Sequence, residues 1–113
     1  MENCIFCKIA AGEIPSNKAY EDDCILAFHD IEPQAPVHVV VIPKKHVAGS
    51  MNETNGENAE VVAHIFRCIP EIAKSLGLNG GYRVVCNCGA DAGQTVQHLH
   101  FHILGGKTLG AMA

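Results

Sequence analysis

The sequence has 113 residues, of which 48% are hydrophobic and 18% charged, and its formal net charge at pH 7 is −4 with neutral histidines. These proportions are typical of a globular protein and argue against a disordered or fibrous chain, and the length fits a single domain of residues 1–113. The lysines and arginines are scattered along the chain, so no nucleic-acid partner is predicted. No apolar run approaches the roughly 20 residues that a membrane-spanning helix needs, so no membrane association is expected.

The apolar pattern predicts, in chain order, a short helix, two strands around an acidic turn, a central strand, a long helix and two final strands. The central strand, HVVVIP, is almost entirely β-branched without polar alternation, which is typical of a strand covered on both faces. These elements are expected at residues 4–15, 18–23, 24–30, 38–43, 61–76, 81–87 and 98–104.

The long helix is predicted from apolar residues that recur at spacings of three and four between Val61 and Leu76. Gly77 supplies its C-terminal stop. Pro70 lies inside this stretch and predicts a kink or a lost hydrogen bond there. The order of elements predicts an α+β fold, with a mostly antiparallel five-stranded sheet and the long helix against one face.

Six cysteines are many for a chain of this length, and in a secreted protein they would predict a disulfide framework. The opening stretch, MENCIFCKIA, lacks the basic flank and long apolar run of a signal peptide. We therefore expect a cytoplasmic protein whose thiols are reduced or bind metal. Four of the cysteines are interpreted as small buried hydrophobic residues, the usual state of a free cysteine: Cys24, Cys68, Cys86 and Cys88.

Near the C-terminus, in the stretch QHLHFHIL, His98, His100 and His102 alternate with apolar residues. Successive side chains of a strand point to opposite faces, so the apolar residues are expected in the core and the histidines on the other face. Two imidazoles about 6.6 Å apart along a strand can share a metal ion, but three span too far for comfortable ligation of one ion. At least one histidine is then available for other chemistry.

The loop before these histidines, NCGADAGQTVQ, combines glycines with amide and hydroxyl side chains. Glycines let backbone N–H groups approach an anion, and the polar side chains can bind phosphate oxygens. Considered separately, the loop also fits a plain surface turn and the histidines fit a solvent-exposed strand face. Together they favour a phosphate site, for which the candidates are Asn87, Gly93, Gln94, Thr95 and Val96.

Two long stretches, YEDDCILAFHDIEPQAPVHVVVIPKKH and GQTVQHLHFHILGG, resemble the histidine triad (HIT) superfamily, whose signature alternates histidines with apolar residues. Within it, they are similar to the purine nucleoside phosphoramidases called Hint, over about residues 4–106. The resemblance implies a HIT-like fold and hydrolysis of a bond to the α-phosphate of a purine nucleotide through a nucleotidyl-histidine intermediate. It also implies a homodimer in which long helices and strands pack across a two-fold axis.

The resemblance further implies roles for individual residues. His100 would be the nucleophile, with its other ring nitrogen held by a backbone carbonyl, while His102 would bind phosphate or protonate the leaving amine. His38 matches a supporting histidine, and Thr95 stands where many relatives have serine and retains the hydroxyl. Asp30 would accept hydrogen bonds from the ribose. The pocket for the nucleoside would comprise Ile5, Phe6, Ile9, Phe28, His29, Asp30 and Ile31.

Cys4 and Cys7 form a Cys-X-X-Cys motif. Bacterial members of the superfamily pair such a motif with the histidine after IPKK and with the first triad histidine, here His46 and His98. The resemblance therefore implies a closed Cys2His2 site for structural zinc, and no catalytic metal or organic cofactor. The alternative is a reduced, metal-free pair, because animal relatives of the Hint branch lack it.

Three other functions remain open from the sequence. A nucleotide-binding regulatory module, whose hydrolysis is incidental, fits the same residues. A dinucleoside polyphosphate hydrolase fits less well, because that branch usually continues with a longer basic segment where this sequence reads GGKTLGAMA. A hydrolase with zinc bound to the triad itself would lose turnover on chelation.

Overall fold

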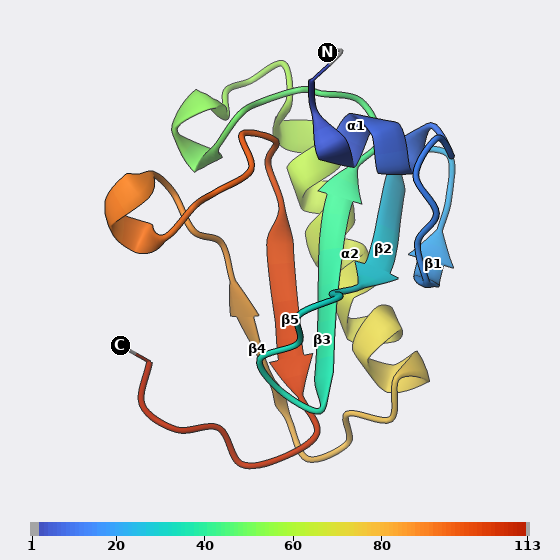
Figure 1. Cartoon of the computed structure of the whole chain (residues 1–113), viewed down its shortest axis with the longest axis vertical. Coiled ribbons are helices and arrows are strands. Elements are labelled where there is room, and N and C mark those ends of the chain that lie inside the picture. The colour runs from blue at the N-terminus through green and yellow to red at the C-terminus, as the bar shows by residue number, and fades with distance from the viewer. Residues whose placement is uncertain (1–2, 113) are drawn as a thin grey trace.

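An antiparallel sheet forms the centre of the structure, a computed structural model that describes residues 3–112 (Figure 1). Its strands lie in the order β1-β2-β3-β5-β4, and every neighbouring pair is antiparallel. The strands are β1 (Lys18–Glu21), β2 (Ile25–His29), β3 (Val37–Pro43), β4 (Tyr82–Val85) and β5 (Phe101–Gly105). The helices are α1 (Ile5–Ala10) and α2 (Ala59–Ser75), with short 3-10 turns η1 (Met51–Glu53) and η2 (Ala90–Ala92). The predicted α+β class and five-stranded antiparallel sheet are confirmed.

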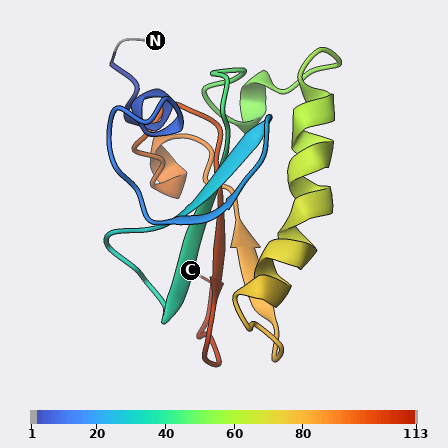
Figure 2. The same cartoon turned by 90° about the vertical axis from the view of Figure 1, so that its right-hand side faces the viewer.

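The two helices cover opposite faces of the sheet (Figure 2). The alternation of strand side chains divides the core accordingly, since successive residues of β3 contribute to different clusters. On the α2 face, the strands contribute Ile25, Ala27, Val39, Val41, Phe101 and Ile103, which pack with Ile65, Ile69 and Ile72 of the helix. On the α1 face, a smaller cluster comprises Leu26, Phe28, Val40 and Ile42, against which Phe6 and Ile9 pack.

Strand β3 lies in the middle of the sheet, between β2 and β5. All its residues from His38 to Pro43 are buried, which confirms the prediction of a central strand covered on both faces. Helix α2 begins two residues before the predicted start and includes Pro70 at an exposed position. Because proline has no N–H, it cannot donate the helical hydrogen bond to the carbonyl of Phe66. Among residues 3–112, no helix is long and apolar enough to span a membrane.

Strand β5 begins at Phe101, so the predicted start at His98 is wrong. The preceding residues leave the ladder because Leu99 donates its N–H to the carbonyl of Ala48. The side chain of His98 meanwhile donates a hydrogen bond to the carbonyl of Pro43, at the end of β3. The alternation of faces nevertheless continues through this irregular segment, with Leu99 in the core on the α2 face. The segment can therefore present histidines to the α1 face without being a strand.

Candidate functional site

The triad histidines are not an exposed polar face. His98 is fully buried, His100 is only 6% exposed and His102 is half-buried. Phe6 of α1 packs edge-on against His100, with the ring centres 5.0 Å apart. The alternative interpretation of a solvated strand face is therefore wrong, because α1 covers this part of the sheet.

The backbone determines which nitrogen of His100 carries the proton. Nδ1 of His100 lies 2.7 Å from the carbonyl oxygen of His98, and a carbonyl can only accept, so Nδ1–H donates. Burial, opposed by this hydrogen bond and by the charge of Asp30, lowers the pKa of His100. The ring is therefore neutral near pH 7, with a lone pair on Nε2. This is the protonation state that a nucleophilic imidazole requires.

A second hydrogen-bond chain orients His38 and His102. The N–H of Gln34 donates to Nδ1 of His38 over 3.0 Å, which leaves the His38 proton on Nε2. That nitrogen lies 2.8 Å from Nδ1 of His102, so His38 donates and His102 accepts. The proton of a neutral His102 ring is then on Nε2. Both residues lie on the α1 face, on adjacent strands β3 and β5.

Asp30 follows β2 and contacts the same chain. Its Oδ2 lies 3.5 Å from Nε2 of His38, while its Oδ1 accepts the N–H of Glu32 at 2.8 Å. One carboxylate oxygen thus organises the turn and the other faces the histidines. The structure also places Asp30, His38 and His102 within reach of one another as possible metal ligands. The hydrogen bond between the two imidazoles already uses one nitrogen of each ring.

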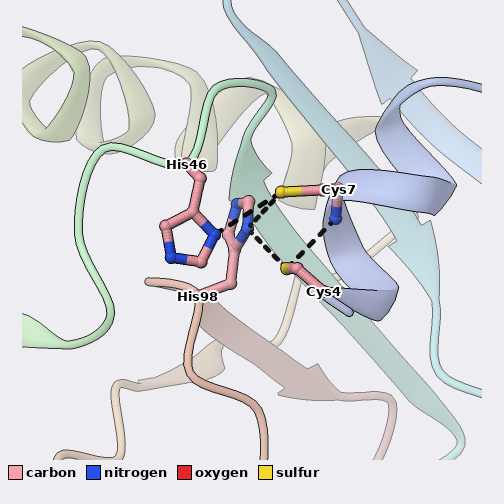
Figure 3. Close-up of side chains that lie close together, drawn as sticks. All are labelled: Cys4, Cys7, His46 and His98. Carbon is pink, nitrogen blue, oxygen red and sulfur yellow. Dashed lines mark hydrogen bonds between the residues drawn. The ribbon is translucent and has the colours of Figure 1, made fainter. Parts of the chain in front are cut away.

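Cys4, Cys7, His46 and His98 converge from three distant segments (Figure 3). Nδ1 of His98 lies 3.2 Å from Sγ of Cys4, and Nδ1 of His46 lies 3.4 Å from Sγ of Cys7. All four donor atoms lie within 4.8 Å of one another. Burial, followed by the neighbouring Cys4, raises the pKa of Cys7, so a bound cation would be needed to hold that thiol as a thiolate near neutral pH. Two sulfurs and two imidazoles are the donors of a structural zinc site, and these residues fit one.

His98 links this cluster to the triad. Its Nε2–H donates to the carbonyl of Pro43 over 2.8 Å, which leaves a lone pair on the Nδ1 that faces the cysteines. Its own carbonyl accepts the proton of His100 Nδ1. One residue therefore contributes its ring to the metal cluster and its backbone to the orientation of His100.

Part of the predicted substrate set lines a cavity of about 550 Å³ beside the metal cluster. Ile5, Thr95 and Val96 line it together with Cys4 and His46. A second cavity of about 600 Å³, between the α2–β4 connection and the C-terminal segment, contains none of the predicted site residues. Thr95 and Gly93 are exposed and Asn87 is half-buried, so the loop that was predicted to bind phosphate lies at the surface beside the first cavity.

Gln94 is buried and organises the loop. Its amide nitrogen donates to the carbonyls of Gly49 and Val96, and its amide oxygen accepts the N–H of Gly89. Both amide protons are thus committed to backbone groups, and the side chain holds the loop rather than facing a phosphate. The sequence identified the residue but could not distinguish these two uses of an amide.

The predicted nucleoside pocket is divided between core and surface. Phe28 is 6% exposed and packs edge-on against Phe6, with ring centres 5.6 Å apart. Ile31 is 94% exposed and Ile5 is 46% exposed, so both offer apolar surface to a ligand. The remaining predicted residues, Ile9, His29 and Asp30, are half-buried.

The expectation that four cysteines are buried small hydrophobic residues holds only in part, since Cys68 and Cys86 pack against the core on the α2 face. Cys24 is exposed, and Cys68, Cys86 and Cys88 are half-buried. Cys68 lies beside His64 of the same helix, four residues away, and that spacing was the signal in the sequence. The N–H of Gln34 and the carbonyls of Pro43 and His98 were not predictable by residue type, because every residue carries such groups.

An antiparallel α+β sheet with three alternating histidines, of which the middle one is oriented by the carbonyl of the first, defines a histidine triad protein. The family model of the HIT domain matches residues 11–109 of this sequence. The chain therefore belongs to the HIT family. The Cys-X-X-Cys motif is present in the structure at Cys4 and Cys7.

Solved structures agree with this assignment. A histidine triad protein from Clostridium difficile is 51% identical, with 100% of this chain and 98% of that chain covered and a TM-score of 0.94. A HIT family hydrolase from Legionella pneumophila is 48% identical over 96% of each chain, with a TM-score of 0.91. A histidine triad nucleotide-binding protein from Candida albicans is 35% identical over 98% of this chain and 84% of that chain, with a TM-score of 0.81.

We predict that acid destabilises the protein through His102. Burial, reinforced by His100 and His38, lowers the pKa of His102 from 6.5 to about 4. Between these values the unfolded chain binds a proton that the folded chain does not, so this contribution is present above pH 6.5 and lost as the pH falls towards 4. In His102→Asn, the free energy of unfolding should fall less steeply over this range, by up to about 1.4 kcal/mol per pH unit. Urea unfolding at several pH values measures both slopes, and equal slopes would contradict the assignment.

Proposed function

We propose that the chain acts as a single HIT domain that hydrolyses the bond between the α-phosphate of a purine nucleoside 5′-phosphoramidate, or a related nucleotide, and its leaving group. The observation that carries the proposal is the hydrogen bond from His100 Nδ1 to the His98 carbonyl, which leaves Nε2 free to attack. The hydrolase from Legionella and the nucleotide-binding protein from Candida support it as family members of similar structure.

In the first step, Nε2 of His100 attacks the α-phosphorus. A bond between nitrogen and phosphorus forms, the bond to the amine breaks, and the amine leaves with its electron pair and takes up a proton. His102 is proposed to donate a hydrogen bond from its Nε2–H to the departing nitrogen, because its Nδ1 accepts from His38, and the amine takes its proton from solvent. The covalent intermediate replaces one difficult displacement by two easier ones.

In the second step, water attacks the phosphorus and the bond to His100 breaks, which returns the electron pair to Nε2. The attacking water gives up its proton to solvent, which balances the proton taken by the amine, and the products are the nucleoside monophosphate and the amine. The Nδ1–H of His100 remains on the His98 carbonyl throughout, so the ring can accept and release the nucleotide without changing its tautomer. This fixed hydrogen bond stabilises the charge of the substituted imidazole.

The substrate would lie between the phosphate loop and α1. Thr95, Asn87 and the backbone of Gly93 and Val96 are the proposed phosphate contacts, with Gln94 holding the loop in place. Asp30 would accept hydrogen bonds from the ribose through Oδ2, the oxygen that the turn does not use. The base would pack against the apolar and aromatic side chains predicted from the sequence: Ile5, Phe6, Ile9, Phe28, His29 and Ile31.

A structural zinc ion is part of the proposal. Cys4, Cys7, His46 and His98 would hold it, and a bound ion would tie α1 to the segments that carry the two histidines. Closed coordination by four protein ligands supplies no catalytic position, so the reaction is assigned to the histidines alone. Because metal-binding thiols must stay reduced, we expect the protein to work in a reducing compartment such as the cytoplasm.

We also propose that two copies associate through β4 and α2. Strand β4 is an edge of the sheet, and its Tyr82 and Val84 are 40% and 37% exposed. Phe66 of α2 is 50% exposed. An exposed apolar edge strand favours pairing with a second copy, which would extend the sheet and cover these side chains.

The first prediction is that His100→Ala abolishes turnover of adenosine 5′-phosphoramidate. Truncation removes the attacking nitrogen, so we expect at least a thousand-fold loss, on the order of other losses of a covalent nucleophile. Mass spectrometry of acid-quenched wild type should find a nucleotidyl adduct on His100. Lys74→Ala is the control, because Lys74 is exposed in the last turn of α2, across the sheet from the triad, and its truncation should leave turnover unchanged. If wild type binds AMP without turnover, the nucleotide-binding regulatory module becomes the better interpretation.

The second prediction is that Cys4→Ser loses one equivalent of bound zinc and melts at a lower temperature. Loss of the ion should also release His98, whose carbonyl orients His100, so kcat should fall more than KM rises. Elemental analysis, thermal unfolding and steady-state kinetics provide the three readouts. Cys24→Ser, which removes an exposed thiol, should match wild type. An unchanged zinc content in Cys4→Ser would contradict the proposed ligand set.

The third prediction is that Val84→Lys converts a dimer into a monomer. A lysine in β4 places a charge at the proposed interface. Lysines on edge strands are known to disfavour pairing with another strand. Light scattering after size-exclusion chromatography measures the mass directly. The control is Lys74→Glu, a charge change at an exposed position of α2 in its last turn. A wild type that is monomeric, or a dimeric Val84→Lys, would refute this interface.

A further inference from the structure

A second group of metal-ligating side chains lies on the α2 face. Asp22 follows β1, and His64 and Cys68 project from α2. Oδ2 of Asp22 lies 2.7 Å from Nε2 of His64, and that nitrogen lies 3.6 Å from Sγ of Cys68. The three donor atoms all lie within 4.8 Å of one another. No part of the proposed hydrolysis uses them.

Local structure brings the three residues together. His64 and Cys68 are four residues apart in α2, so their side chains lie one above the other on one face of the helix. Asp22 is held in place by its own turn, because its Oδ1 accepts the N–H groups of Cys24 and Ile25. The hydroxyl of Tyr20 donates to Oδ2 of Asp22 over 2.8 Å. The carboxylate is thus fixed before any ligand arrives.

Ionisation of Asp22 supports its use as a ligand. Desolvation opposes the charged form, but hydrogen bonds from His64, from the turn N–H groups and from Tyr20 outweigh it and hold the pKa of Asp22 below its ordinary value. The hydrogen bond to Asp22 also raises the pKa of Tyr20, so that hydroxyl stays protonated. The group therefore offers one carboxylate, one imidazole and one thiol.

These residues resemble a Cys-His-Asp catalytic set, but their geometry differs from one. A relay needs the carboxylate on one ring nitrogen and the thiol on the other. Here Asp22 and Cys68 both approach Nε2 of His64. Three donors that converge on one point, instead of lying in a row, are arranged to share a ligand.

The distances fit a borderline metal ion. Tetrahedral zinc with ordinary bond lengths sets a sulfur and a nitrogen ligand about 3.6 Å apart and an oxygen and a nitrogen ligand about 3.4 Å apart. The distance between Nε2 of His64 and Sγ of Cys68 is already 3.6 Å, the separation expected for a sulfur and a nitrogen ligand. Asp22 and His64 must separate by roughly 0.7 Å, which the side chains can provide by exchanging their hydrogen bond for two metal bonds.

We propose that Asp22, His64 and Cys68 form a second metal site that takes zinc or a similar divalent transition ion. Mixed oxygen, nitrogen and sulfur donors favour such an ion over magnesium or calcium. On binding, the proton of Cys68 goes to solvent and the His64 proton moves from Nε2 to Nδ1. Three protein ligands leave a fourth coordination position, for water or for the Tyr20 hydroxyl beside it.

The site links two parts of the fold and is reachable from solvent. It joins the turn between β1 and β2 to the middle of α2, so a bound ion would hold the hairpin against the helix. The side chains of His64 and Asp22 are 29% and 25% exposed, which provides a path for the ion. His64 and Cys68 belong to α2, which covers the face of the sheet opposite α1 (Figure 2). Asp22 follows β1, at the edge of the sheet opposite the proposed dimer edge β4.

The test is the number of zinc ions bound by the reduced full-length protein after equilibrium dialysis, counted by elemental analysis. Wild type should bind one equivalent more than Cys68→Ser and His64→Ala, whatever the occupancy of the cluster around Cys4. Zinc should raise the melting temperature of wild type by more than that of either variant. Cys24→Ser, which removes an exposed thiol from the adjacent turn, should bind as many ions as wild type.

Cobalt(II) provides an independent readout. In a Cys4→Ser/Cys7→Ser background, the charge-transfer absorption from thiolate to cobalt should persist and should disappear when Cys68→Ser is added. Equal zinc contents for wild type, Cys68→Ser and His64→Ala would overturn the proposal. So would a cobalt absorption that depends on Cys24 rather than Cys68. Turnover of the phosphoramidate by these variants tests the proposed function separately. The metal site can exist without hydrolase activity, and hydrolysis can occur without the metal site.

Discussion

The antiparallel pairing of β3 with β5 is the contact on which the rest of the site depends. It sets Val39 opposite Ile103 and Val40 opposite His102. Because the side chains alternate, this register sends Val39, Phe101 and Ile103 to the α2 face, and it sends His38 and His102 to the α1 face. A shift of β5 by one residue would turn His102 towards α2 and Ile103 towards the α1 face. The hydrophobic pattern of the two strands therefore aligns the imidazoles as well as the core.

Beyond the end of this pairing, backbone groups take over the positioning of the rings. The carbonyls of Pro43 and His98 each accept one imidazole proton, and the N–H of Gln34 donates to a third ring. Each contact selects a tautomer as well as an orientation. The irregular segment before β5 leaves the His98 carbonyl available to an imidazole. In a regular ladder, a carbonyl that points towards the neighbouring strand would accept a hydrogen bond from that strand. The break in the strand is therefore part of the site.

The sheet also separates two groups of cysteine and histidine. On one face, α1 carries Cys4 and Cys7 to His98, and on the other, α2 carries Cys68 beside His64. Neither arrangement follows from cysteine content, which by itself fits buried thiols as well as ligands. The first group was predicted through the resemblance to bacterial histidine triad proteins, which pair such a Cys-X-X-Cys motif with two histidines. The second was missed because its third member, Asp22, is distant in sequence and joins α2 only when the β1–β2 hairpin packs against it.

The sequence by itself determined the α+β class, the central strand and the three histidines, since each follows from a local periodicity in apolar residues. It also predicted Gln94 as a phosphate contact, whereas the folded loop uses this side chain to hold the carbonyls of Gly49 and Val96. Only the tertiary structure decided where β5 begins, which nitrogen of each imidazole is protonated and which thiols have a histidine beside them. The physical reason is that periodicity records which face a side chain occupies, whereas hydrogen bonds and metal ligation depend on atoms that long-range packing brings within a few ångströms.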